Sequence, residues 1–292
     1  MASSILQAVI DGVLTGSVYA LMAAGLTLIF GVMDIINIAQ GVLVVLGAYL
    51  SYELEQRWGI DLFTGLLITI PLMFGLGVMI QTAFLRRLGG HERTAMSILV
   101  TYAVAIIVEG VLGQDFGVDY VQLHAWYVDQ SVHLFGFYLP YIYVFGFVLA
   151  AGMLAALYFM LYRTKFGRSV RASLQDRAAA RLVGIDVDKV AAVTFGIGVA
   201  VTAAGGMVFG ATNAFNPNSG YDLISRLLAI VILGGLGSIG GAMGAAVFAL
   251  VVEDVVSIWS PTWAPLVFFA LLVLVLSVRP IGFFGHQAAR AQ

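Results

Sequence analysis

Long apolar runs separated by short polar intervals dominate the chain. A helix needs about 20 mostly apolar residues to cross the hydrocarbon core of a bilayer. Backbone groups within lipid must be paired inside the segment, and the runs are continuous rather than alternating, so they predict helices and not the strands of a barrel. The predicted spans are residues 5–30, 38–54, 62–84, 96–113, 138–161, 190–211, 226–257 and 264–278.

The fold predicted from this pattern is an all-α, polytopic transmembrane helix bundle that forms a single domain over residues 1–292. It has about eight spans, or nine if the long run at 226–257 is two helices. Composition agrees, because 61% of the residues are hydrophobic and only 10% are charged, whereas an average soluble domain has about 25% charged residues. The chain is therefore predicted to work within a lipid bilayer.

The distribution of Lys and Arg orients the predicted helices, because basic loops tend to face the cytoplasm. The loops 85–95 and 162–189 are basic, whereas the loop 114–137 holds Asp residues and no Lys or Arg. We therefore expect the two basic loops and the C-terminus to be cytoplasmic and the acidic loop to be external. The net charge of −2 gives no reason to expect a nucleic-acid partner, and without cysteine or clustered histidine no metal site is predicted.

Polar residues interrupt the apolar pattern directly after the first span. Asp34, Asn37 and Gln40 recur every third residue and are followed by Gly41. On a helix they would form one polar stripe, and polar groups at membrane depth tend to face a bundle interior or a water-filled path. The alternative is a short cytoplasmic turn in which Asn37 caps the next helix.

A glycine-rich stretch interrupts the long run at 226–257. Its centre, Gly235-Leu-Gly237-Ser238-Ile-Gly240, matches the dinucleotide-binding fingerprint in form, but it lies in an apolar span with no βαβ unit. We therefore reject nucleotide binding here. Small residues at this spacing favour tight helix packing or a break in the helix, and discontinuous helices near the bilayer midplane are typical of transporters.

The loop 163–189 predicts a short basic helix outside the membrane. Residues 168–183 are good helix formers without Gly or Pro, and Gly184 supplies a stop. An apolar stripe is expected at Val170, Leu174, Ala178 and Leu182. Such a helix can rest on anionic membrane lipid or dock into a groove of a cytoplasmic partner, and composition alone does not separate the two.

Several segments, in this order, resemble the Liv-type permeases, the membrane subunits of ABC importers for branched-chain amino acids, amides and related compounds. They cover most of the chain. The matching segments are SVYALMAAGLTLIFGVMDIINIAQGVLVVLGAYL (17–50), TKFGRSVRASLQDRAAARLVGIDVDKV (164–190), FGIGVAVTAAGGMVFG (195–210), ILGGLGSIGGAMGA (232–245) and RPIGFFG (279–285).

The resemblance implies a division of labour. The chain lacks a phosphate-binding Gly-x-x-x-x-Gly-Lys-Ser/Thr loop, so it is expected to be no enzyme and to bind no cofactor. ATP would be hydrolysed by two separate ATP-binding subunits. A second, related permease chain would complete the path, and an external, periplasmic binding protein would deliver the solute. The expected location is the bacterial inner membrane.

The two interruptions supply the candidate path residues, and the resemblance supplies the candidate coupling residues. Expected along the translocation path are Asp34, Asn37, Gln40, Gly41, Gly235, Gly237 and Ser238. Expected to couple the loop to an ATPase are Gly167, Arg168, Arg171, Ala172, Asp176 and Gly184. The family usually reads Asn-Phe-Ala-His-Gly where this chain has Asn37-Ile-Ala-Gln40-Gly41, which leaves the solute open.

An ion-coupled secondary transporter or channel is the alternative function. Asp11, Glu109, Glu253 and Asp254 lie within or near the ends of apolar runs, where acids can relay protons. The simpler interpretation of Glu253 and Asp254 is that they are hydrated at the interface.

Overall fold

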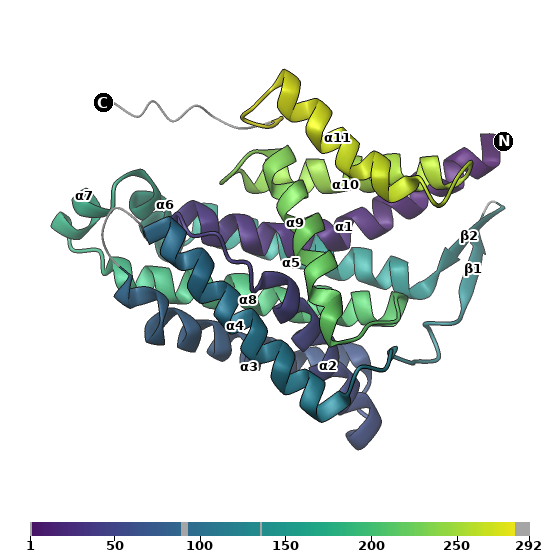
Figure 1. Cartoon of the computed structure of the whole chain (residues 1–292), viewed down its shortest axis with the longest axis horizontal. Helices are drawn as coiled ribbons and strands as arrows, with labels where there is room; N and C mark the ends of the chain where they lie inside the picture. Colours follow the sequence, from purple (N-terminus) through teal and green to yellow (C-terminus); the bar gives the residue numbers. More distant parts are fainter. Residues whose placement is uncertain (1, 89–92, 135, 284–292) are drawn as a thin grey trace.

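The computed structural model describes residues 2–88, 93–134 and 136–283 and consists mainly of helices (Figure 1). Within these residues six helices are long and apolar enough to cross a membrane. They are α1 (Ala2–Met33), α3 (Leu62–Ala83), α4 (Arg93–Phe116), α5 (Tyr141–Arg163), α8 (Val187–Thr212) and α10 (Ile239–Ser257). The predicted helical membrane bundle is thereby confirmed.

Shorter helices complete the bundle. The long apolar run at 226–257 is two helices, α9 and α10, as its length allowed. The remaining helices are α2 (Gln40–Trp58), η1 (Leu85–Arg87), α6 (Lys165–Gln175), α7 (Arg177–Leu182), η2 (Pro217–Ser219), α9 (Gly220–Gly234) and α11 (Ala264–Val278).

A small hairpin departs from the all-α prediction. Strands β1 (Ser131–Leu134) and β2 (Phe137–Pro140) pair antiparallel in the loop that was expected to be external. The side chain of Gln7 at the start of α1 holds this hairpin, because its Nε2 donates to the carbonyl of Tyr138 (2.7 Å) and its Oε1 accepts from the Tyr138 amide (3.0 Å). Figure 1 shows the hairpin at one end of the molecule and α6 and α7 at the other.

Helices α1 and α8 lie at the centre of the bundle. α1 packs most extensively against α10, and α8 packs against α3, α2 and α1. Small residues allow this close packing. A Cβ atom added at Gly25 of α1 would lie only 2.6 Å from the carbonyl oxygen of Gly198 in α8, and one at Gly12 would lie 2.5 Å from the Cα of Val251 in α10. These glycines therefore allow the helices to approach closely.

Two interruptions of the helical pattern lie inside the bundle. We name residues 34–39, between α1 and α2, the first break, and residues 235–238, between α9 and α10, the second break. The starts of α2 and α9 lie against each other, because a Cβ added at Gly220 would be 2.8 Å from the Cα of Val42. These discontinuous helices shape the candidate site.

Candidate functional site

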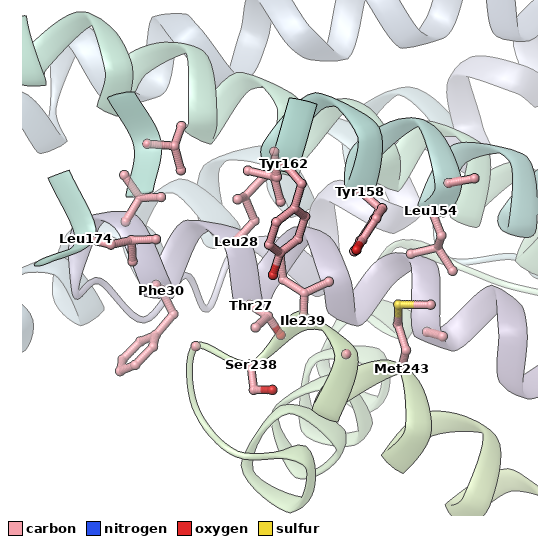
Figure 2. Close-up of a pocket in the computed structure, with 18 of the residues that line it drawn as sticks. Thr27, Leu28, Phe30, Leu154, Tyr158, Tyr162, Leu174, Ser238, Ile239 and Met243 are labelled. Atoms are coloured by element: carbon pink, nitrogen blue, oxygen red, sulfur yellow. The ribbon is translucent and has the colours of Figure 1, made fainter. Parts of the chain in front are cut away.

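A cavity of about 1490 Å³ lies between α1, α5, α6 and the start of α10. Its wall is mainly apolar, with side chains such as Leu28 and Leu154 directed toward it (Figure 2). The residues of the wall that carry hydroxyl groups are Ser17, Thr27, Tyr158, Tyr162 and Ser238. An apolar cavity with a few convergent polar groups is the usual form of a small-molecule site.

The charged side chains of the cavity wall lie at one end of it. Among the residues that line the cavity, all of which the structure describes, Asp34 and Arg171 are the charged ones. Both belong to the end where α6 meets the C-terminal part of α1. The hydroxyls of Ser17 and Thr27 donate to carbonyls of their own helix, at 2.7 and 2.8 Å. Their oxygens can therefore only accept a further hydrogen bond, from a donor on a bound molecule.

The second break borders the cavity directly. Gly235 and Gly237 have φ of 98° and 83°, a conformation in which a Cβ would be strained. Ser238 then begins α10, and its Oγ accepts a hydrogen bond from the Gly241 amide (3.1 Å). A helix precedes the glycines instead of a strand, which agrees with the rejection of a dinucleotide site. The break exposes Gly237 and Ser238 to the cavity.

Apart from Asp34, the residues of the first break do not line the cavity. Asn37 and Gln40 are fully buried. The Nδ2 of Asn37 donates to Oε1 of Gln40 (2.9 Å), and Nε2 of Gln40 donates to the carbonyl of Gly198 in α8 (3.0 Å). Thr101 of α4 holds the same segment, since its hydroxyl accepts from the Ile38 amide at 3.2 Å. The first break is therefore fixed to both α8 and α4.

Two expectations for the first break are wrong. Residues 34–39 are not helical, so the polar residues form no helical stripe. Asn37 does not cap α2 either, because Ala39 holds the cap position and no side chain bonds there. The Nδ2 of Asn37 donates to Gln40, while its Oδ1, the atom that would accept from the backbone amides at a helix start, has no partner among the described residues.

The predicted single helix over 168–183 is also wrong, because α6 and α7 are separate. Asp176 lies between them with φ −156° and ψ 115°. Its Oδ1 accepts hydrogen bonds from the amides of Ala178 and Ala179, at 2.7 and 3.1 Å. An Asp that satisfies these amides stabilises a new helix start and interrupts the preceding helix.

The break divides the predicted apolar stripe. Val170 is fully buried, Leu174 is 44% exposed, and Leu182 is 89% exposed. Gly184 ends α7 with φ 85°, as predicted from the sequence. Only the α6 part of the stripe faces the bundle, and α7 presents an exposed apolar tip.

A tight corner joins α5 to α6. The side chain of Arg171 donates from Nη1 to the carbonyl of Leu161, and its guanidinium lies 5.2 Å from the ring centroid of Tyr162. Gly167 packs against the carbonyls of Met160 and Leu161 so closely that a Cβ would not fit. A cation at a helix C-terminus also interacts favourably with the helix dipole. We call these residues the α5–α6 corner.

Comparison with known proteins identifies the chain. The family described as "Branched-chain amino acid transport system / permease component" matches residues 8–276. The chain belongs to this family. The high-affinity branched-chain amino acid transport system permease protein LivH of Salmonella typhimurium is 31% identical over 296 residues, covering 96% of each chain. The corresponding protein BraD of Pseudomonas aeruginosa is 29% identical over 307 residues, again with 96% of each chain covered.

A further relative matches over a shorter stretch and imports a different kind of solute. The autoinducer 2 import system permease protein LsrC of Klebsiella pneumoniae is 33% identical over 139 residues, 43% of this permease and 40% of the relative. No solved structure matches the permease. The resemblance noted from the sequence motifs is confirmed, and the permease is an integral membrane protein of this family.

The candidate path residues of the permease fall into two groups. Asp34, Gly237 and Ser238 line the cavity. The others lie behind its wall, where they join helices to each other: Asn37, Gln40, Gly41 and Gly235. Gly41 meets α9, because a Cβ there would be 2.7 Å from the backbone nitrogen of Ile224.

The candidate coupling residues of the permease also divide. Gly167 and Arg171 belong to the α5–α6 corner, and Ala172 is half-buried. Arg168 and Asp176 are exposed, as is Gly184 at the end of α7. The exposed members remain available to a partner.

Sequence reasoning missed a buried ion pair in the permease. Arg226 of α9 makes two hydrogen bonds of 2.8 Å to the carboxylate of Glu253 in α10, and its guanidinium lies 5.3 Å from the ring centroid of Phe268. Glu253 is only 8% exposed, so the expected hydrated position at the interface is wrong for this residue. The lone Arg within an apolar run was the available signal, since such a charge needs a partner.

Proposed function

We propose that the chain is the membrane subunit of an ABC importer that moves a branched-chain amino acid, or a related small amino acid or amide, inward across the bacterial inner membrane by alternating access. The observation that carries the proposal is the cavity, whose apolar wall fits an aliphatic side chain. Its hydroxyl groups supply hydrogen-bond partners for the polar end of such a solute. The branched-chain amino acid transport of the relatives LivH and BraD supports the solute class.

The end of the molecule that holds α6 and α7 is proposed to be cytoplasmic. Basic residues concentrate there, and Arg86 and Arg181 both lie by Asp188, with the ion-pair atoms 3.9 and 3.3 Å apart. The segment after α11 reaches the same end, since the amide of Phe283 donates to the carbonyl of Leu233 (2.8 Å). The hairpin at the opposite end would then be external, where a binding protein delivers the solute.

The chain is proposed to make about nine passes, of which α9 and α11 are the short ones with 15 residues each. α9 has 15 residues and is about 22 Å long, which is short of the roughly 30 Å hydrocarbon core. In the second break Gly235 is buried and Leu236 and Gly237 are exposed, and turns pair its backbone, such as the Ser238 amide donating to the carbonyl of Gly235 (3.0 Å). Such a half-helix is tolerated where protein surrounds it.

The partners proposed are two ATP-binding subunits, a second permease chain and an external binding protein. α7 favours docking onto an ATP-binding subunit, because Leu182 and Val183 are 89% and 75% exposed beside Arg181. An exposed apolar tip with basic neighbours suits a groove on a cytoplasmic protein.

The test is uptake into proteoliposomes that contain the permease, its second permease chain and the ATP-binding subunits. Uptake of radiolabelled leucine delivered by the binding protein should require ATP and both kinds of subunit. Uptake by the permease chains without ATP-binding subunits would contradict the proposal, as would loss of uptake on adding an uncoupler while ATP is held constant.

A further inference from the structure

Three elements from distant parts of the chain meet at the α6 end of the cavity. A Cβ added at Gly31 of α1 would lie 3.4 Å from Cδ2 of Leu174 in α6 and 3.7 Å from the Cα of Gly237 in the second break. All three residues line the cavity. Figure 2 shows Leu174 at this end, beside Phe30 and with the loop of the second break nearby. Leu174, Gly31 and Gly237 therefore meet at that end of the cavity, which Asp34 and Arg171 also line.

The α5–α6 corner holds the helix that carries Leu174. Arg171, one turn before Leu174, bonds the carbonyl of Leu161 and lies over the ring of Tyr162. Thr164 reinforces the corner, since its Oγ1 accepts from the Gly167 amide (3.0 Å). A displacement of α6 would therefore carry Leu174 and the end of α5 together.

No side-chain bond holds Gly31 and Gly237 against Leu174. Gly31 and Gly237 have no side chains, so van der Waals contact alone joins them to each other and to Leu174. Gly237 also stands in a turn with φ 83°, between helices that are tied together elsewhere by Arg226 and Glu253. The junction can thus separate without breaking a hydrogen bond, whereas the α5–α6 corner cannot.

We propose that Leu174, Gly31 and Gly237 form the cytoplasmic gate of the cavity, with Leu174 as the positioning residue through which α6 opens and closes it. This inference rests on the proposed importer function and deepens it. A movement of the ATP-binding subunits would be transmitted to the cavity through α6. This helix is next to the exposed α7 and also forms part of the cavity wall.

Cross-linking tests the gate. The chain contains no cysteine, so the double variant Gly31→Cys with Leu174→Cys introduces the only thiols of this subunit. It is assembled into the complete transporter in proteoliposomes and treated with a short bis-methanethiosulfonate. The cross-link should form, its yield should change several-fold between the nucleotide-free and the vanadate-trapped complex, and it should stop uptake until a reductant is added. An equal yield in both states, no cross-link, or normal uptake by the cross-linked transporter would overturn the gate.

A matched pair of substitutions tests the role of Leu174. Leu174→Ala should lower the solute moved per ATP hydrolysed several-fold while ATP hydrolysis continues, and Leu174→Met should restore most of that ratio. Leu182→Ala, the same change on the exposed α7, should reduce subunit assembly or ATPase stimulation and leave the ratio unchanged. Equal ratios for Leu174→Ala and wild type would refute the positioning role. Absence of ATP-driven uptake by the wild-type complex would instead refute the proposed function.

Discussion

The two breaks in the bundle differ both in composition and in what surrounds them. The first break, residues 34–39, is tied by Asn37 and Gln40 to α8 and by Thr101 to α4. The second break, residues 235–238, is built from glycines and faces the cavity. In the first break polar side chains join helices to each other, whereas in the second break glycine backbone lines the cavity.

The largest expected effect comes from filling the contact behind the first break. In Gly41→Ala the new Cβ would be 2.7 Å from the backbone nitrogen of Ile224, and backbone cannot move aside easily. The loss should be about 3 kcal/mol or more in the free energy of unfolding, seen as little folded protein in membranes. Gly240→Ala at the second break is the control, because nothing lies within 4 Å of its Cβ. Equal accumulation of the two variants would contradict the comparison.

Removing the buried amide should have the next largest effect. Gln40→Ala leaves the Asn37 amide and the Gly198 carbonyl without partners, at a cost of about 2 kcal/mol. The melting temperature in detergent should fall, while KM for uptake stays unchanged. Gln56→Ala on the exposed side of α2 is the matched control and should change stability by less than about 0.5 kcal/mol. A raised KM with normal stability in Gln40→Ala would assign this residue to the path instead.

At the second break, transport should respond more than stability. Ser238→Ala removes the cap of α10, which costs about 1 kcal/mol, and removes a hydroxyl from the cavity wall. Ser238→Thr keeps the cap but adds a methyl group to the wall. Uptake assays should show a changed KM for both variants, with a lowered melting temperature for the alanine variant alone. An unchanged KM in both would remove Ser238 from the path.

The smallest effect is expected at Asp34, for its substitution by Asn. This residue is exposed to the cavity and has φ 54°, a left-handed conformation that Asn also tolerates. Asp34→Asn should alter stability by less than about 0.5 kcal/mol, so that any change in uptake reports the charge. Asp34→Val should cost about 1–2 kcal/mol, because a β-branched residue is strained there. Thermal unfolding that ranks the two variants in reverse would exclude strain at this position.

The sequence predicted the helical bundle well, because span length and continuous apolarity are local properties. It also placed both breaks, since Gly and clustered polar residues interrupt hydropathy directly. The separation of α6 from α7 escaped prediction because residues 168–183 all favour helix, and only the side chain of Asp176 bonding to Ala178 and Ala179 reveals the second start.

Pairings between helices could not be read from the chain. Arg226 and Glu253 meet only because α9 and α10 fold back on each other at the second break. The tyrosines of the cavity wall, Tyr158 and Tyr162, lie in an ordinary apolar run, and nothing local marks the side that faces the cavity. The contact of Leu174 with Gly31 likewise depends on how α6 turns back toward α1.

Cysteine accessibility tests the central claim most directly, namely that the cavity beside the second break is the solute path and that the buried Asn37–Gln40 contact is not part of it. Ser238→Cys and Asn37→Cys would each be made in the assembled transporter and treated with a hydrophilic thiol reagent, with and without transported amino acid. The account predicts that Ser238→Cys is labelled and that solute slows its labelling, whereas Asn37→Cys reacts only after unfolding. Labelling of Asn37→Cys in the folded transporter with protection by solute, and none at Ser238→Cys, would contradict it.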